Sequence, residues 1–366
     1  MIRRFPAKPK HAKGVERETH MRDLRIVRNI TGLTACIAAV VTVSMSASAW
    51  GTKGHNLINH LAAVSLPASF PAFMRTQAAV EELSDLGIEL DLLKGAGTEW
   101  DSENNPGHYI DLSLDDTVAG FPLRNLPATR EAYDTSLRTR GSDQYKSGYL
   151  PYSILQGWEQ LRMEFAYWRV DRYEAMHAKT TALRMKGATH RGIDETIILR
   201  DAGVWGHFVA DASQPLHISV HFNGWGNYPN PNGYSNSKHI HDLFESAYVD
   251  RYITLPAVAR LLLPLKVPRA GTLVSGKEAM RNIARYLSAS NATVTELYKI
   301  EKAGEFNHPT PEATLFVAAR LAFGAGELRD LIVWAWEDSL NETIGDDIPQ
   351  RVRDIVTGGA TYQGLK

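Results

Sequence analysis

Two histidine–carboxylate pairs with the same spacing stand out in the second half of this chain. His207 precedes Asp211 by four residues, and His241 precedes Glu245 by four. Positions i and i+4 lie on one face of a helix, so each pair can direct two ligand atoms at one ion. A further histidine, His217, lies between the pairs. The spacing predicts a divalent-metal site made of imidazole and carboxylate groups.

Further candidate ligands lie in the first third of the chain. They are His55, Asp91 and His108, and Asp101 is an alternative to Asp91 as a carboxylate preceding His108. Each has a structural interpretation when taken alone: a polar residue of a first helical turn, an acid at a helix end, or a buried core histidine. Together they extend an all-nitrogen and oxygen ligand set without thiolate, which suits zinc in a hydrolytic site.

The segment before Trp50 has the pattern of an export signal. Arg22, Arg25 and Arg28 precede the apolar residues 31–45, and Ser46–Ala49 supply a small-x-small cleavage site. The apolar stretch is shorter than the ~20 residues that span a bilayer, although an uncleaved anchor is the alternative. We therefore expect residues 1–49 to be an N-terminal extension plus signal peptide, and the mature chain to be periplasmic or secreted.

Cleavage before Trp50 would create a metal-binding terminus. The freed α-amine of Trp50 and its own carbonyl oxygen would lie five residues before His55 in sequence. A neutral amine, a carbonyl and an imidazole are together able to bind a divalent cation. This third site depends entirely on the position of the cut.

Composition limits the functions open to the mature chain. The only cysteine, Cys36, lies in the signal, so stability must come from a core, from bound metal or from both. Residues 1–49 hold nine of the 40 basic and three of the 41 acidic residues, which leaves a net charge of −7 from Trp50 onward. That charge argues against a protein that grips polyanions with a broad basic surface. An anionic substrate would need local positive charge, which bound metal supplies.

The elements that must position these ligands are mostly helices. Apolar periodicity predicts helices, while residues 95–127 are expected to be loop with a short hairpin and 219–238 a long loop. Strand signals are scarce, so we predict a mainly α fold, with residues 50–366 as one domain. The predicted helical ranges are 54–66, 71–94, 128–140, 151–186, 191–213, 239–254, 275–303 and 310–341.

At these residues the chain resembles the superfamily of zinc-dependent single-strand nucleases of the S-one/P-one type and bacterial zinc phospholipases C. The resemblance covers nearly all of the mature chain in order and spacing, and it implies a multi-helix fold with long loops around a trinuclear zinc cleft. The motifs that carry it are Trp50…His55, Asp91, His108-Tyr109-Ile110-Asp111, His207-x-x-x-Asp211-x-x-Gln-Pro-Leu-His217, Gly-Trp-Gly-Asn227, His241-x-x-x-Glu245 and Ala319-Arg320-Leu321-Ala322.

The resemblance implies an assignment of ligands to three zinc ions. Asp91, His108, His207 and Asp211 would hold the first ion. His217, His241 and Glu245 would hold the second. The third would take the Trp50 amine and carbonyl, His55 and Asp211, which bridges two ions. Asp91 is preferred to Asp101 because it precedes His108 by 17 residues rather than seven, closer to the family's gap.

The resemblance also implies phosphodiester hydrolysis. Zinc lowers the pKa of bound water toward about 7 and so makes a nucleophile available at neutral pH. Asp91, Lys94 and Asp211 are the expected catalytic residues, and Tyr109, Asp111 and Asn227 are the expected substrate-binding residues. Lys94 and Asn227 favour a single-strand nuclease or 3′-nucleotidase acting on DNA and RNA.

Two other functions remain open from the sequence. The His241-x-x-x-Glu245 pair, with glutamate rather than aspartate, favours a phospholipase C acting on phosphatidylcholine-type lipids. A non-catalytic zinc-binding protein is the third candidate. No stable protein partner is predicted for any of them.

Overall fold

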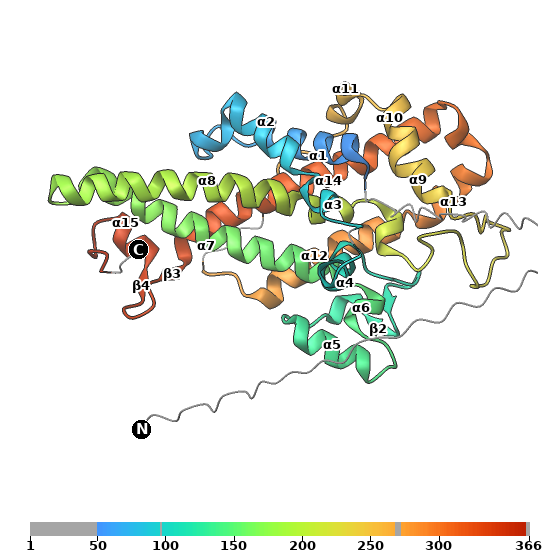
Figure 1. Cartoon of the computed structure of the whole chain (residues 1–366), viewed down its shortest axis with the longest axis horizontal. Coiled ribbons are helices and arrows are strands. Elements are labelled where there is room, and N and C mark those ends of the chain that lie inside the picture. Colours follow the sequence, from blue (N-terminus) through green and yellow to red (C-terminus); the bar gives the residue numbers. More distant parts are fainter. Residues whose placement is uncertain (1–49, 96, 268–271, 364–366) are drawn as a thin grey trace, which may run out of the picture. The chain divides into compact units, whose positions relative to one another are not determined.

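Three long helices lie at the centre of the described part of the chain. The computed structural model describes residues 50–95, 97–267 and 272–363, so the expected signal peptide lies outside the described residues. Helices α7 (Leu150–His177), α8 (Thr181–Asp211) and α14 (Pro311–Asp338) pack on one another, and α1 (Thr52–Val64) packs on α14 (Figure 1). The residues from Trp50 onward form one unit, so the mainly α, single-domain fold is confirmed.

Aromatic side chains fill the space between the long helices. Trp158 of α7 and Trp334 of α14 are buried with ring centroids 4.5 Å apart. Phe165 and Trp168 of α7 contact Trp336 of α14, at 5.5 and 5.6 Å between centroids. The aromatic residues of the predicted helix 151–186 therefore belong to the core. This rigid core holds the end of α8, which carries two of the predicted ligands.

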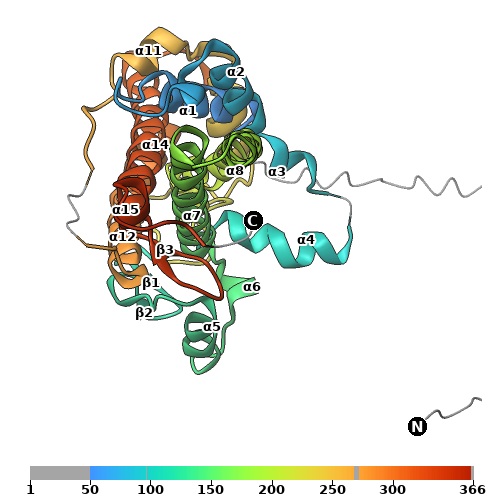
Figure 2. The same ribbon diagram turned by 90° about the vertical axis from the view of Figure 1, so that its left-hand side faces the viewer.

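Shorter elements surround the long helices. Figure 2 shows α3 and α4 projecting beside α7 and α8. The shorter helices are α2 (Gln77–Leu86), α3 (Glu89–Leu92), α4 (Glu99–Asn104), α5 (Arg130–Arg138), α6 (Gln144–Ser147), α9 (Ile240–Asp242), α10 (Tyr248–Tyr252), α11 (Leu255–Ala259), α12 (Gly276–Asn291), α13 (Val294–Lys302) and α15 (Val352–Val356). A π-helical turn, Leu243–Ala247, joins α9 to α10, and 3-10 turns include Ala72–Arg75, Asn105–His108, Leu123–Asn125, Pro215–Ile218, Glu305–Asn307 and Ser339–Asn341.

Two minimal antiparallel hairpins are the strand content of the described residues. Strand β1 (Thr117–Val118) pairs with β2 (Phe121–Pro122), and β3 (Thr343–Ile344) pairs with β4 (Gln350–Arg351). The first hairpin is the one expected within 95–127. Its turn carries Ala119 at φ 46° and Gly120 at φ 76°, a left-handed conformation that favours glycine.

The structure departs from the predicted elements at several places: the predicted helix 71–94 is a 3-10 turn followed by α2 and α3, 275–303 is divided into α12 and α13, and α6, α11 and α15 lie outside the predicted helical ranges. The predicted helix 151–186 is interrupted, because α7 ends at His177 and Thr180 caps α8 by accepting a hydrogen bond from the Leu183 amide. The predicted loop 95–127 contains α4, a short polar helix without the apolar periodicity that would reveal it. The long loop 219–238 has no helix or strand, as expected. No described helix is both long enough and apolar enough to cross a bilayer.

Candidate metal centre

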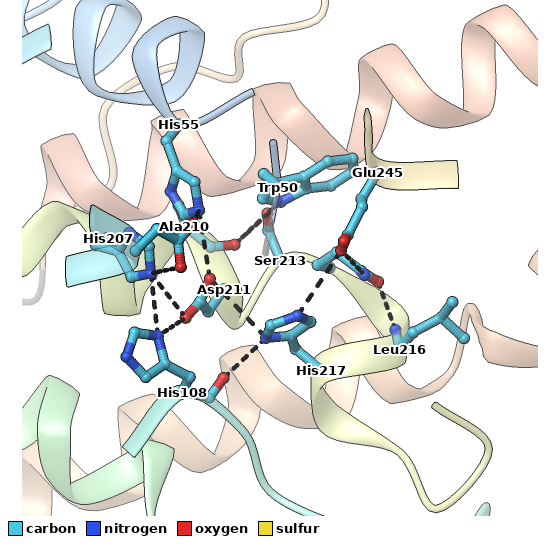
Figure 3. A network of polar contacts seen from close by, with 12 residues as sticks. Trp50, His55, His108, His207, Ala210, Asp211, Ser213, Leu216, His217 and Glu245 are labelled. Atoms are coloured by element: carbon cyan, nitrogen blue, oxygen red, sulfur yellow. Dashed lines mark hydrogen bonds and ion pairs between the residues drawn. The ribbon is translucent and has the colours of Figure 1, made fainter. Parts of the chain in front are cut away.

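The end of α8 brings most of the predicted ligands together. His207 and Asp211 lie on its last turns and are completely buried. His55, in the first turn of α1, and His108, which ends the 3-10 turn Asn105–His108, point at the same place (Figure 3). Asp91, on α3, completes this part of the centre. Residues far apart in sequence thus converge because α1, α3 and the 105–108 turn all meet α8.

His207 lies at the centre of the first group of candidate ligand atoms. The Nε2 atom of His207 lies 3.0 Å from Nδ1 of His108, 3.5 Å from Oδ1 of Asp91 and 3.5 Å from Oδ2 of Asp211. Bonds of about 2.0–2.2 Å in a tetrahedron place ligand atoms roughly 3.3–3.6 Å apart. Asp91, His108 and His207 form one group whose ligand atoms all lie within 4.8 Å of one another, and Asp211 lies beside it.

Asp211 faces a second group with its other oxygen. Its Oδ2 lies 3.0 Å from Nδ1 of His108, whereas Oδ1 lies 3.6 Å from Nε2 of His55. The His55 ring stacks on that of His207 at 3.9 Å, so His207 also adjoins this second group. Both ring nitrogens of His55 are buried without a hydrogen-bond partner. An imidazole in that condition is costly unless a cation binds it.

Trp50 lies against the same end of α8. Its completely buried indole donates from Nε1 to the carbonyl of Ala210 (3.1 Å) and to Oγ of Ser213 (2.8 Å) (Figure 3). Its ring also packs on Phe244 at 5.1 Å. The indole is thus held next to the turn that carries Asp211. Whether its amine becomes a ligand depends on cleavage before Trp50.

The third group lies on the α9–α10 segment and the turn after α8. Oε2 of Glu245 is 2.9 Å from Nε2 of His241 and 3.8 Å from Nε2 of His217. The amide of Gln214 donates to the same oxygen at 2.9 Å and accepts from the Leu216 amide. Gln214 therefore holds the Glu245 carboxylate in place, a role that the sequence motif alone did not reveal.

Backbone carbonyls set the orientation of three of the histidines. Nδ1 of His207 donates to Gly87, that of His217 to His108 and that of His241 to Phe222, over 2.8–2.9 Å. In its neutral form each of these rings carries its proton on Nδ1 and directs Nε2 into the centre. Metal-binding histidines are typically held this way.

Burial favours the neutral form of four of the imidazoles. It lowers the pKa of His55, His108 and His217 well below the usual value and that of His207 to about 4. For His241 burial also lowers the pKa, but the Glu245 carboxylate and hydrogen bonds outweigh it, so the pKa is raised.

The pKa values of two buried carboxyls are raised, as expected where little positive charge is nearby. Burial raises the pKa of Asp211 far above its usual value and that of Glu245 to about 7. Among the described residues, the carboxylates of this cluster have one lysine partner and no arginine partner. That lysine is Lys94, whose Nζ lies 2.6 Å from Oδ1 of Asp91. A cluster of neutral imidazoles and buried acids fits bound cations.

A cavity of about 390 Å³ opens onto the third group and Lys94. Tyr109 also lines it, and its hydroxyl donates to the Tyr145 carbonyl at 3.0 Å. Asp111 is also part of the lining, and burial raises its pKa to about 7. The complete lining is Lys94, Asn105, His108, Tyr109, Asp111, Lys146, Leu216, His217, Phe222, Asn223 and His241.

Two residues considered from the sequence, Asp101 and Asn227, lie outside the ligand groups and the cavity. Asp101, the rival of Asp91, accepts a hydrogen bond from the Gly97 amide at 2.6 Å and belongs to no three-ligand group among the described residues. Asn227, expected to bind substrate, is exposed and does not line the cavity; Phe222 and Asn223 of the same loop do. The loop turns at Gly224 and Gly226, both with positive φ, before it reaches Asn227.

No protein-family model matches this chain, and a comparison with curated proteins finds no significant similarity. The interpretation of the site therefore rests on the geometry of its own residues. Three buried groups of His, Asp and Glu are each able to hold a metal ion: His55–His207–Asp211, Asp91–His108–His207 and His217–His241–Glu245.

Proposed function

We propose that the mature chain is an exported zinc-dependent phosphodiester hydrolase that cleaves single-stranded DNA and RNA and 3′-nucleotides. One observation carries this proposal. Three buried ligand groups, two of which share His207 and adjoin Asp211, lie beside a cavity that also presents a lysine and an aromatic ring. Positive charge deep in a cavity and a flat apolar surface at its wall suit a phosphate joined to a base.

The ligand set favours zinc over other common cations. Histidine nitrogens and carboxylate oxygens without thiolates, in closely spaced groups, are typical of hydrolytic zinc sites. Asp91, His108, His207 and Asp211 would hold one ion, and His217, His241 and Glu245 another. The Trp50 amine and carbonyl would complete a third with His55 and Asp211. When bound, zinc supplies water activated at neutral pH and charge that stabilises the phosphoester's transition state.

One acidic and one basic side chain, Asp211 and Lys94, would shape the electrostatics of the reaction. Asp211 is placed to hold two ions at a defined separation, because its two oxygens face different ligand groups. Lys94 pairs with Asp91 and lines the cavity, so its ammonium can neutralise charge on the non-bridging phosphate oxygens. Both roles position charge, and positioned charge is the main source of catalysis in phosphoryl transfer.

Tyr109 and Asp111 would bind the base. The Tyr109 hydroxyl is occupied by the Tyr145 carbonyl and burial raises its pKa to about 12, so the free part of this side chain is the ring. Its contribution is therefore stacking rather than proton transfer. Asp111 follows on the same strand-like segment, and its carboxyl can accept from an N–H of the base edge.

A phospholipase C is the second candidate function, and one observation favours it. Leu92 and Leu93, directly before Lys94, are 66% and 52% exposed, and Trp100 of α4 is 38% exposed. Exposed apolar side chains close in sequence to residues that line the cavity would suit entry into a lipid surface. A zinc-binding protein without turnover is the remaining alternative.

One set of assays separates the candidates. Exported protein is sequenced from its N-terminus, analysed for metal and assayed on single-stranded DNA, RNA, 3′-mononucleotides and phosphatidylcholine micelles. We expect a chain that begins at Trp50, about three zinc ions and turnover of the nucleic acids. The variant with Leu92→Ser and Leu93→Ser is the matched control, since it should impair lipid turnover alone. Lipid hydrolysis with inert nucleic acid would reverse the order, and metal without any turnover would favour the non-catalytic protein.

A further inference from the structure

A second cavity, of about 350 Å³, adjoins the metal-site cavity. The segment Asn104–His108 separates the two, because Asn104 lines the second cavity whereas Asn105 and His108 line the first. Because Asn104 and Asn105 are consecutive, the linings of the two cavities include the same stretch of backbone. They also share a side-chain wall. The ring of His108 lies 5.1 Å from that of Phe208, which lines the second cavity.

The second cavity combines a cation with aromatic surface. The Arg130 guanidinium lies 4.1 Å from the centre of the Tyr149 ring, and both side chains line the cavity. Within the described ranges, Arg130 forms no ion pair with a carboxylate. Arg200, in contrast, pairs with Asp201 at 2.5 Å. Arg130 is therefore the cation available to an incoming anion, and a guanidinium binds phosphate through paired N–H donors.

Other lining groups match the remainder of a nucleotide. Phe208 and Trp205 present aromatic surface, and the amide of Gln156 offers both a donor and an acceptor. Stacking on aromatic rings holds bases of any sequence. A cavity on another face, lined by Arg281 and Arg285, also contains Asp115, Asp116 and Glu278, so acids there offset the cations.

We propose that the second cavity is a subsite for the nucleotide next to the one held at the metal centre, with Arg130 binding its phosphate. The proposal rests on the proposed function and deepens it. A polymer fixed at the metals must leave the first cavity on some side, and this adjoining cavity offers an arginine that is not ion-paired. The subsite would make the enzyme prefer oligonucleotides over mononucleotides.

Binding of a short fluorescent oligothymidylate with hydrolysis-resistant phosphorothioate linkages tests the proposal. The protein is the zinc-loaded mature chain, and anisotropy is measured over a range of salt concentrations. Arg130→Ala should raise the Kd about tenfold, and it should reduce the slope of log K against log salt by about 0.7, the value for one phosphate contact on a single strand. Arg130→Lys should keep the slope. The matched control Arg281→Ala should change neither quantity.

Two further measurements guard against a merely structural effect of the substitution. The KM for a 3′-mononucleotide should be the same in wild type and Arg130→Ala, since a mononucleotide does not reach the subsite. A single uncharged methylphosphonate linkage beside the central one should weaken binding to wild type but not to Arg130→Ala. This second comparison changes the ligand rather than the protein, so it holds even if the variant is less stable.

The outcomes separate the subsite from the proposed function. An unchanged salt slope in Arg130→Ala, or an equal loss for the mononucleotide, would overturn the subsite while leaving hydrolysis intact. If wild type binds the oligonucleotide through Arg130 but cleaves no nucleic acid, the subsite stands and the proposed function fails. If wild type does not bind the oligonucleotide, the subsite is wrong whatever the enzyme hydrolyses.

Discussion

Two clusters of buried charge in this protein differ in how they are compensated. On α7, Arg162 lies 3.0 Å from Asp338 and 2.6 Å from Glu342, and it also donates to the Val274 carbonyl. At the end of α8, Asp211 is buried among neutral imidazoles instead. In the first cluster one arginine pairs with both acids, whereas in the second Lys94 pairs with Asp91 and leaves Asp211 and Glu245 without a lysine or arginine partner among the described residues.

The difference indicates which cluster is structural and which binds a ligand. A buried charge needs an opposite charge or strong hydrogen bonds, because desolvation otherwise outweighs its burial. The Arg162 cluster meets that need within the chain. The α8 cluster leaves Oδ1 of Asp211, Nε2 of His217 and both ring nitrogens of His55 without hydrogen-bond partners. Cations from solution would complete it, and the following predictions test this contrast.

The largest effect is expected from Asp211→Ala. Its two oxygens face different ligand groups, so the variant should lose about two metal ions and at least 1,000-fold in kcat. Metal analysis and turnover of single-stranded DNA measure both. Asp101→Ala is the matched control, because Asp101 belongs to no ligand group and should leave metal content unchanged. An unaltered metal count in Asp211→Ala would contradict the bridging role.

Metal removal should lower stability substantially. A ligand that binds only the folded state stabilises it by about 4 kcal/mol at 1,000 times its Kd, so loss of several ions should lower Tm clearly. Differential scanning calorimetry with and without a chelator measures the change, and added zinc should restore it. A Tm that is the same in chelator and in zinc would show that the α8 cluster is stable without cations.

Arg162→Met should destabilise the protein without affecting metal. Removal of one partner from a buried ion pair costs about 3–5 kcal/mol, here because Asp338 and Glu342 would remain buried without their cation. Denaturant unfolding of the zinc-loaded protein measures the loss. Metal content and KM should match wild type. A drop in metal content at retained fold would mean that the two clusters are coupled.

A moderate effect is expected from Tyr109→Ala. Loss of a stacked ring costs about 1–3 kcal/mol per base, so KM for 3′-mononucleotides should rise roughly tenfold or more. Zinc content should stay constant, since Tyr109 is joined to His108 by the backbone but is not itself a candidate ligand. Tyr109→Phe is the conservative control and should keep a near-normal KM. Unchanged nucleotide kinetics in Tyr109→Ala would remove base stacking from the proposal.

The smallest effect is a pH dependence at Asp111. Burial raises its pKa to about 7, so the carboxyl is protonated below that pH and becomes a full acceptor above it. If it accepts from the base, KM for guanosine 3′-phosphate should fall a few-fold as the pH rises through 7. Asp111→Asn should lack this change. The ratio of KM in wild type to KM in Asp111→Asn, measured against pH, isolates this change, because titration of other groups affects KM of both proteins alike.

Local patterns predicted which paired residues lie close together, because this proximity depends on neighbours in sequence. The pairs at i and i+4 required only a helix, and His207 and Asp211 do lie together on α8. The second pair, His241 and Glu245, spans α9 and a π-helical turn that the spacing alone did not reveal, yet both side chains still meet. Helix α4 escaped prediction since its six residues have no apolar stripe.

The sequence by itself determined the mainly helical class and the chemical types of the ligands, because periodicity and residue identity are local properties. Only the tertiary structure decided between Asp91 and Asp101, placed Phe222 and Asn223 rather than Asn227 in the cavity, and revealed Gln214 and Arg130. These outcomes depend on contacts between segments far apart in the chain. Such contacts arise from the packing of α1, α3 and the long helices, which no local pattern encodes.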